Sequence, residues 1–409
     1  MNKNNIKNIF FNTVGNMAYL GAIWLISILV VKLSNFTNAG MLSVAMSTSN
    51  IYISLASYTA RLYYAADIEE KYSDSQYFTF RFLTTTVSLI LCIGISLFIG
   101  YSIQQFLVIV LFYIYKVEEM LSDILIGTMQ RKDCLYKGGI TITVKAIFSL
   151  LAFIIILLFT RNLIFALIAI DIVGGLVLIL GDYRIACDLS GEVIIIDLKK
   201  YKPILNLLVI CFPLFITGLC YNIIPSLPRL VFERMYTAEE MGYYSSISTI
   251  TVLISTAVNC IIVPLIPTLS TYYKQKDKKK FSNLSWGTGG IIVCLGIICI
   301  LLEHLFGNWI LKILFGSEIL PYEYIFKWVI IATILTSEII LFNAVFTSVN
   351  LQDRLMKASL VGLVICIITV LPLCRYLYML GVTLCLIIAQ TVEIIVLLAY
   401  TLNISKKFI

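Results

Sequence analysis

Residues 203–256, KPILNLLVICFPLFITGLCYNIIPSLPRLVFERMYTAEEMGYYSSISTITVLIS, decide the fold of this chain. The stretch is apolar and long enough to cross a bilayer, yet it contains Pro213, Pro225 and Pro228, and Arg229 follows the last proline. Because proline removes a backbone donor and clashes with the preceding turn, we expect this helix to bend or break. In lipid, a broken helix is tolerated only against protein or a water-filled cavity. The pattern therefore predicts a polar cavity that holds Arg229, and the alternative is that Arg229 only caps the helix at the water interface.

The same stretch resembles an earlier part of the chain, at an offset of about half its length. The aligned pairs are Gly40 and Gly242, Ser43 and Ser245, Ser47 and Thr249, Ser54 and Thr256, and Lys32 and Arg234. Internal repeats of this kind are typical of transporters. The alignment sets Arg229 against Ser27, deep in the first apolar helix, so we expect Arg229 inside the membrane, roughly 7–8 Å before its helix ends.

The composition indicates a polytopic membrane protein. The chain is 60% hydrophobic and only 13% charged, whereas a soluble domain is about a quarter charged. Its formal charge of +7 does not indicate a nucleic-acid partner, because the basic residues of membrane proteins gather in cytoplasmic loops. The cysteines are scattered through apolar stretches without a CxxC pair, which favours buried hydrophobic residues over disulfides or metal ligands.

Hydropathy divides the chain into twelve apolar spans, each near the ~20 residues that a bilayer requires. The spans are 9–33, 39–61, 78–100, 104–128, 138–160, 162–186, 203–235, 240–270, 285–306, 322–348, 356–374 and 378–402. With an even number of spans in each half, both halves begin on the same side of the membrane. The sequence therefore predicts an all-α membrane protein with two parallel six-helix bundles around a central cavity.

The basic residues orient this topology. If the N-terminus is inside, the cytoplasmic segments hold about three times as many basic residues as the outer ones, including the run Lys274–Lys280. We therefore expect both termini in the cytoplasm and the protein in a bacterial cytoplasmic membrane. The predicted limits are an N-terminal bundle over 1–186, a cytoplasmic linker over 187–202 and a C-terminal bundle over 203–409.

Two of the spans are rich in hydroxyl groups. The span 39–61 carries many Ser, Thr and Tyr residues, and 240–270 carries Tyr243, Ser245 and several others. Hydroxyl groups in lipid need partners, so these side chains face either other helices or a wet interior. Because they occur at matching repeat positions, we favour a shared wet surface and predict Tyr243 and Ser245 as substrate contacts.

Four charged residues inside spans form a second candidate cluster. Lys116, Glu119 and Asp123 share one helix face by their i+3 and i+4 spacing, and Lys145 lies at a similar depth on the next helix. Charges at mid-membrane cost about 2.5–3.5 kcal/mol each on insertion scales, so each needs a reason. One interpretation is a structural ion-pair cluster of Glu119, Asp123 and Lys145, and the other is a cavity wall or a proton or Na⁺ relay.

Three further acidic residues stand alone in their spans: Asp171, Glu338 and Glu393. An isolated carboxyl group in a low-dielectric environment can gain or lose a proton or bind a cation. We therefore predict these three residues as candidates for coupling to an H⁺ or Na⁺ gradient, with Glu338 and Glu393 as the better candidates.

The sequence carries no catalytic motif. It lacks a glycine-rich phosphate loop, a nucleophile with a histidine base and a metal-ligand pattern. No loop between spans is long enough for a soluble catalytic domain. We therefore expect no enzyme activity, no catalytic residue, no metal and no cofactor.

Four stretches resemble the Wzx-type polysaccharide flippases of the MOP (MATE-like) exporter superfamily. They are KNIFFNTVGNMAYLGAIWLISILVVKLSNFTNAGMLSVAMSTSNI at 7–51, DIEEKYSDSQYFTFR at 67–81, GTMQRKDCLYKGG at 127–139 and LPRLVFERMYTAEEMGYYS at 227–245. The resemblance implies two six-helix bundles around a cationic cavity. It also implies transport of an undecaprenyl-pyrophosphate-linked oligosaccharide from the inner to the outer leaflet, with Arg229 as the cavity arginine and Arg61 as a weaker candidate.

The leading hypothesis is thus a lipid-linked oligosaccharide flippase that works by alternating access in surface polysaccharide biosynthesis. Arg229, assisted by Lys116 or Arg61, would hold the pyrophosphate, because a guanidinium group binds phosphate at two points. Membrane lipids and a polysaccharide polymerase machinery are the expected neighbours. The alternatives are a MATE-like cation or drug antiporter, which would place acidic residues in the N-terminal cavity, and a membrane polysaccharide polymerase, which would need a large outer loop.

Overall fold

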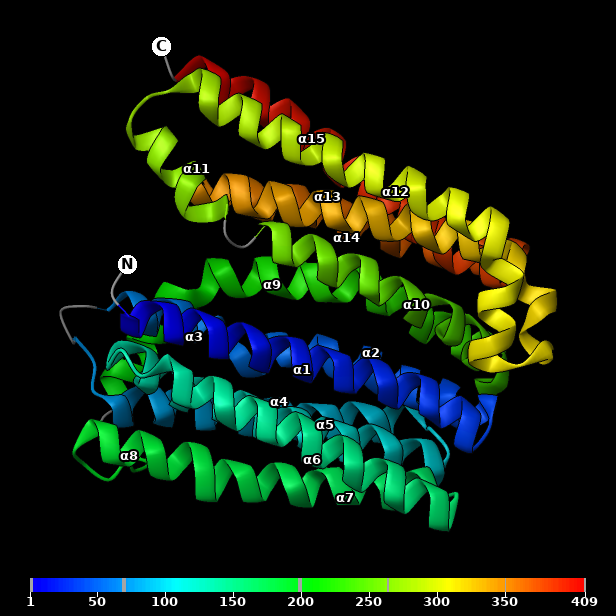
Figure 1. Ribbon diagram of the computed structural model, residues 1–409, viewed down its shortest axis with the longest axis horizontal. Coiled ribbons are helices and arrows are strands. Elements are labelled where there is room, and N and C mark those ends of the chain that lie inside the picture. The colour runs from blue at the N-terminus through cyan, green and yellow to red at the C-terminus, as the bar shows by residue number, and fades with distance from the viewer. Residues whose placement is uncertain (1–2, 68–70, 198–200, 263–264, 350, 408–409) are drawn as a thin grey trace. The chain divides into compact units, whose positions relative to one another are not determined.

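The structure is a computed structural model that describes residues 3–67, 71–197, 201–262, 265–349 and 351–407 (Figure 1). Every regular element in these ranges is a helix. The chain divides into two compact units, Met1–Leu219 and Cys220–Ile409. The division falls inside a helix, and the predicted bundle limits of 1–186 and 203–409 remain a prediction.

Unit 1 is built from the helices that precede this division. They are α1 (Lys3–Leu33), α2 (Phe36–Ser57), α3 (Ala60–Ala66), α4 (Asp74–Ile99), α5 (Ile103–Arg131), α6 (Leu135–Thr160), α7 (Leu163–Val177), the π-helix η1 (Leu178–Tyr183), α8 (Arg184–Ser190) and the first part of α9 (Tyr201–Met235). The elements α7, η1 and α8 follow one another without a break, so residues 163–190 form one continuous span.

Unit 2 holds the end of α9 and the remaining elements. They are α10 (Ala238–Ile262), α11 (Leu265–Lys274), α12 (Lys278–Phe315), the 3₁₀ helix η2 (Ser317–Ile325), α13 (Phe326–Ser348), α14 (Gln352–Leu377) and α15 (Met379–Lys407). Each of the twelve predicted spans coincides with one helix or with a run of consecutive helices.

Within the described residues, nine helices are long and apolar enough to cross a membrane. The three predicted spans outside this group are α2, α5 and α10. These are the helices in which the sequence places the hydroxyl-rich runs and the charge cluster. The polar side chains that a bilayer penalises are therefore concentrated on three helices, and such side chains are stable in a membrane only against protein or water.

Of the predicted bend or break at the prolines of α9, the break does not occur, and the bend remains a prediction. Residues 201–235 form one helix, with Pro225 and Pro228 in its interior. Pro228 cannot donate to the carbonyl four residues earlier, which belongs to Ile224. The Sγ of Cys366 on α14 donates to that carbonyl at 3.7 Å. A neighbouring helix thus takes over part of the lost backbone bonding, which is how membrane helices tolerate proline.

Glycine lets α1 and α6 approach closely in unit 1. A Cβ atom added at Gly139 would lie 2.3 Å from the backbone oxygen of Phe11, and one added at Gly15 would lie 2.4 Å from the backbone oxygen of Gly139. Small residues at such contacts allow membrane helices to pack backbone against backbone. This contact holds α1, which carries part of the polar cluster described below, against α6.

Candidate functional site

The guanidinium group of Arg229 is held by uncharged partners in unit 2. Its Nη2 donates to Ser248 Oγ at 3.3 Å, and its Cζ lies 5.8 Å from the centre of the Tyr244 ring. Its Nε is buried without a hydrogen-bond partner. Among the residues that the structure describes, no carboxylate forms an ion pair with Arg229. In the described part of the chain, Arg229 is therefore a half-buried cation whose Nε donor is unused.

The two α10 residues predicted as substrate contacts, Tyr243 and Ser245, do not hold Arg229, and their role remains a prediction. Tyr243 stacks on Tyr322 with ring centroids 4.6 Å apart. Ser245 Oγ donates to the backbone oxygen of Gly242 at 3.0 Å. The residues that contact Arg229 are instead four apart on one face of α10, and the repeat alignment selected the neighbouring face. The spacing of Tyr244 and Ser248 would have been the signal for them.

Lys116 and Glu119 form the first part of a polar cluster in unit 1. Lys116 Nζ lies 2.8 Å from Glu119 Oε2 on the same helix, α5. Tyr19 on α1 bridges them, because its hydroxyl accepts from Lys116 at 2.5 Å and donates to Glu119 at 2.5 Å. The charge of Lys116, which we predicted to assist in phosphate binding, is therefore compensated by a carboxylate in this structure.

Asp123 holds two arginines. One carboxylate oxygen pairs with Arg61, and the other accepts from Arg81 Nη2 at 3.2 Å. The Arg81 side chain is 0% exposed, and its Nη1 donates to the backbone oxygen of Ala56 at 3.1 Å. Arg81 is a site residue that the sequence analysis does not single out, although its place seven residues inside α4 is a signal of burial. Arg61, like Lys116, is thus already paired.

The ion pair predicted between Lys145 and Glu119 or Asp123 is not formed. Lys145 lines a cavity of about 90 Å³ together with both carboxylates, but its Nζ has no hydrogen-bond partner in the described part of the chain. The amine instead lies 4.8 Å from the centre of the Tyr115 ring. The physical reason is competition: Lys116 and the two arginines already occupy the two carboxylates.

The three isolated acidic residues differ in their hydrogen bonding and in the unit to which they belong. Both carboxylate oxygens of Asp171 on α7 are buried without a hydrogen-bond partner, and the same holds for Oε1 of Glu338 on α13. Glu393 on α15 is 3% exposed and accepts from Ser359 Oγ at 2.6 Å. Asp171 belongs to unit 1 and the other two to unit 2, and the role of all three in ion coupling remains a prediction.

Glu118 is an additional acidic residue near Asp171 in unit 1. Its Oε2 is buried without a partner, and the carboxylate packs against Gly174 on α7, where a Cβ atom would lie 2.1 Å from Oε2 and 3.3 Å from Cε of Lys145. The sequence places Glu118 on the same helix as Glu119, but only the packing of α5 against α7 assigns the two residues to different surroundings.

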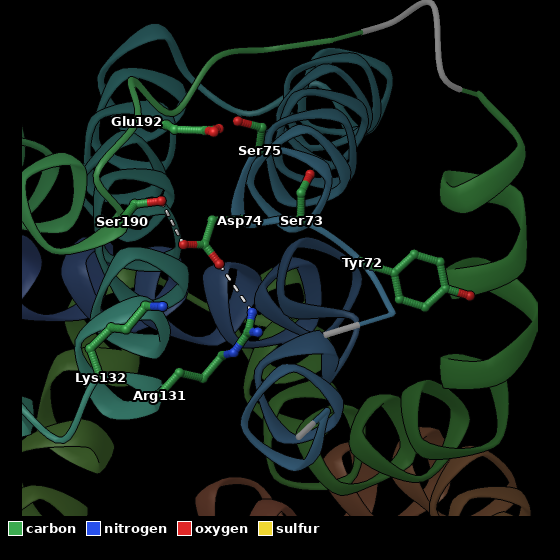
Figure 2. Close-up of a pocket in the computed structure, with 8 residues that line it drawn as sticks. All are labelled: Tyr72, Ser73, Asp74, Ser75, Arg131, Lys132, Ser190 and Glu192. Carbon is green, nitrogen blue, oxygen red and sulfur yellow. Dashed lines mark hydrogen bonds and ion pairs between the residues drawn. The ribbon is translucent and has the colours of Figure 1, made fainter. Parts of the chain in front are cut away.

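A second polar pocket, of about 240 Å³, lies where α4 begins and α5 and α8 end (Figure 2). Asp74 accepts from Arg131 Nη1 at 3.0 Å and from Ser190 Oγ at 2.8 Å. The pocket is lined by Tyr72, Ser73, Asp74, Ser75, Arg131, Lys132, Ser190 and Glu192. Two of the stretches that resemble the flippases, 67–81 and 127–139, therefore meet in one ion pair that holds three helix ends together.

Asp67 organises the segment that leads into this pocket. Its carboxylate accepts from the backbone nitrogens of Lys71 at 3.1 Å and Tyr72 at 3.3 Å, and from the Tyr77 hydroxyl at 2.8 Å. Burial raises the pKa of Asp67, but these hydrogen bonds outweigh burial and lower the pKa below its usual value. The ionised carboxylate is thus part of the folded segment.

Comparison with known proteins gives the fold. No family model matches the chain. The "Capsular polysaccharide biosynthesis protein CapF" of Staphylococcus aureus is 22% identical over 321 residues, which cover 76% of this chain and 78% of CapF. A multidrug-resistance MATE transporter of the MOP superfamily superimposes with a TM-score of 0.66 in its inward-facing conformation, at 12% identity over 97% of this chain and 95% of the other. The chain has the fold of the MOP-superfamily transporters.

The MATE transporter VcmN of Vibrio cholerae, as its D35N mutant, has the same MOP fold, with a TM-score of 0.63 and 13% identity over 97% of both chains. The predicted resemblance to the MOP exporters is therefore confirmed, as is the all-α membrane architecture with twelve spanning helices in two bundles. Among the described residues, no group of three or more His, Cys, Asp or Glu side chains is arranged to hold a metal ion.

Proposed function

We propose that this protein is a flippase that moves undecaprenyl-pyrophosphate-linked oligosaccharide units from the inner to the outer leaflet by alternating access. The MOP fold supports transport, and the similarity to CapF supports a place in capsular polysaccharide biosynthesis. The single observation that carries the substrate class is Arg229, a half-buried guanidinium group with neutral partners and without a carboxylate.

Arg229 would bind the pyrophosphate. An anion of about two charges is expensive to place in a low-dielectric interior without a counter-charge. The planar guanidinium fork offers two parallel hydrogen bonds to phosphate oxygens. Ser248 holds one Nη of the fork, so the side chain is oriented before the substrate arrives.

Arg61 and Lys116 would act later or not at all on the phosphate. Each is compensated by a carboxylate, Asp123 for Arg61 and Glu119 for Lys116. A substrate anion has to displace these partners, and the displaced carboxylate would then be left in a poorly solvated place. They are therefore weaker anchors than Arg229, and they contribute only in a conformation in which their ion pairs open.

Coupling to an H⁺ or Na⁺ gradient would use the unpartnered carboxyl groups. In unit 1, the Glu118 carboxylate packs against Gly174, three residues after Asp171 on α7, and Glu338 lies in unit 2. A carboxyl group without hydrogen-bond partners has a large energetic difference between its charged and neutral forms, so binding of a cation at such a group can shift a conformational equilibrium. The Ser359 hydroxyl already donates a hydrogen bond to one carboxylate oxygen of Glu393. Glu393 is therefore the weaker candidate for ion coupling.

A MATE-like cation or drug antiporter is the second candidate. The observation in its favour is the acidic pair Glu118 and Asp171 in unit 1, where an antiporter for cations would place acidic residues. A membrane polysaccharide polymerase is a weaker alternative, because the connections between the predicted spans are too short for a catalytic domain.

For the flippase, we propose a location in the bacterial cytoplasmic membrane with both termini inside, in contact with membrane lipids and beside a polymerase machinery.

A deletion strain tests the proposal. Loss of the flippase should trap lipid-linked oligosaccharide on the inner leaflet, where enzymes added outside spheroplasts do not reach it, and wild-type protein should restore its exposure. Complementation with Arg229→Ala should leave the unit trapped. Unpolymerised units exposed on the outer leaflet would indicate a polymerase instead. A strain with normal surface polysaccharide but increased drug sensitivity would indicate the antiporter.

A further inference from the structure

The turn between α11 and α12 carries the densest positive charge of unit 2. Five lysines occur within Lys274–Lys280, with Asp277 as the only acidic residue among them, and all five lysines are exposed. We infer that this turn is a binding surface for the anionic phospholipid headgroups of the surrounding bilayer. The inference does not depend on the proposed function, because it concerns the lipids of the surrounding bilayer rather than the transported lipid-linked oligosaccharide.

The backbone of this turn is fixed by its own hydrogen bonds. The backbone nitrogen of Asp277 donates to the carbonyl of Tyr272 at 3.0 Å, and that of Gln275 donates to Thr271 at 2.9 Å. Lys276 has a φ of 57°, in the left-handed region that glycine or asparagine occupies at lower cost. The turn is therefore one defined conformation that presents its lysines outward.

Hydrophobic residues on both sides attach the turn to the core of unit 2. Leu269 on α11 is 0% exposed, and Phe281 on α12 is 7% exposed in the same core cluster. Tyr273 and Phe281 close the turn, with ring centroids 6.2 Å apart. These contacts hold α11 and α12 together at the turn that carries the lysines.

Only one of the five lysines is used within the turn. Lys280 pairs with the Asp277 carboxylate at 3.0 Å, and that carboxylate also accepts from the backbone nitrogen of Lys280 at 3.0 Å. The other four lysines form no ion pair among the described residues. Asp277 therefore serves as the N-cap of α12, and four ammonium groups are available to an external anion.

Helix α12 is long enough to extend beyond the hydrocarbon core of a bilayer at the end that carries these lysines. The helix has 38 residues, about 57 Å at 1.5 Å per residue, which exceeds the ~30 Å hydrocarbon core. Lys278 precedes the predicted span start at Ser285 by roughly 10 Å of helix, within reach of the headgroup layer. Trp286 is 61% exposed at this start, as expected for an aromatic residue at the membrane interface.

The chemistry of the turn fits a lipid surface better than a single soluble ligand. Ammonium groups are flexible point charges, and here they project from a convex turn without a lined cavity. Lysine clusters next to a spanning helix are attracted to anionic lipids, and each lysine near the surface strengthens binding by about fivefold. The structure thus assigns the turn to phospholipid headgroups.

The test uses the full-length protein purified into mixed phosphatidylglycerol and phosphatidylcholine micelles or nanodiscs. A variant with glutamine at 274, 276, 278 and 279 keeps Lys280 for the cap of α12. We expect wild-type protein to retain phosphatidylglycerol in preference to phosphatidylcholine. The glutamine variant should lose at least about tenfold of that enrichment, because it lacks four lysines that each strengthen binding about fivefold. A matched variant with arginine at the same four positions should retain it.

A salt titration tests the same inference on the wild-type protein alone. Raising the ionic strength to about 1 M shortens the screening length to about 3 Å, so the wild-type enrichment should fall toward that of the glutamine variant. Equal enrichment in the wild-type and glutamine proteins would overturn the inference. It would also be overturned if inorganic phosphate stabilises the wild-type protein against heat as well as phosphatidylglycerol does and this stabilisation is lost in the glutamine variant, because the turn would then be a free-phosphate site.

Discussion

Removal of the Asp123 carboxylate should strongly destabilise unit 1, because it leaves Arg81 buried without a counter-charge. The Arg81 side chain is 0% exposed and pairs with Asp123 at 3.2 Å. Breaking a buried pair from one side costs about 3–5 kcal/mol. At about 2–4 °C per kcal/mol for a unit of this size, Asp123→Ala should lower the unfolding temperature by about 6–20 °C.

Arg61→Ala provides the matched control. The side chains of Arg61 and Asp123 are 27% and 25% exposed, and an ion pair with this exposure is worth about 0–1 kcal/mol. Asp123 keeps Arg81 in this variant, so no buried charge is left alone. We therefore expect a shift several times smaller than that of Asp123→Ala.

The assay is thermal unfolding of the detergent-solubilised protein, followed by intrinsic fluorescence or by loss of monodisperse protein. If Asp123→Ala does not accumulate, the double variant Asp123→Leu/Arg81→Met should restore expression, because replacing both partners by apolar residues is often neutral. Equal shifts for Asp123→Ala and Arg61→Ala, or no rescue by the double variant, would refute the reasoning.

The remaining predictions concern packing, pH and topology. Gly139→Ala should destabilise the protein because its Cβ atom has no room between α1 and α6, whereas Gly94→Ala, with no atom within 4 Å of the added Cβ, should be neutral or slightly stabilising in thermal unfolding. Asp67→Asn should reduce the free energy of unfolding at neutral pH and should match wild type in acid. The lowered folded-state pKa of Asp67 stabilises the wild-type fold at pH values above the ordinary pKa of about 3.9, and this stabilisation is lost as the pH falls through the folded-state pKa. A difference that persists unchanged in acid would count against this. In a cysteine-free background, cysteine at position 276 should react with an impermeant reagent only from the cytoplasmic side, and labelling from outside would overturn the predicted topology.

The spans were predictable because the bilayer imposes one strong rule. A spanning helix needs about 20 mostly apolar residues, and among the described residues nine helices satisfy this rule, including the part of α9 that contains Pro225 and Pro228. The sequence predicts a bend or a break in α9, and the break does not occur, because a donor on another helix replaces part of the lost bonding and sequence spacing does not reveal that donor. The thiol of Cys366, far along the chain, supplies the bond to Ile224.

The candidate site was predictable in residue type but not in partner choice. The i+3 spacing of Lys116 and Glu119 on one helix was sufficient to expect their contact. The partners of Asp123 come from α3 and α4, and their identity depends on how these helices pack. Lys145 shows the consequence: it has the right depth, but nearer cations already occupy both carboxylates.

The central claim is that Arg229 is the phosphate anchor, and surface polysaccharide per unit of membrane-inserted protein tests it most directly. Arg229→Ala should reduce this ratio at least tenfold, since hydrogen bonds to charged groups are worth about 1.5–3 kcal/mol each. Arg229→Lys keeps the charge and loses the fork, so it should retain partial transport. Arg234→Ala, which removes a charge from the last turn of the same helix, should transport normally. If Arg229→Ala equals wild type on this ratio while only its expression falls, Arg229 is a helix cap and the account of the site is wrong.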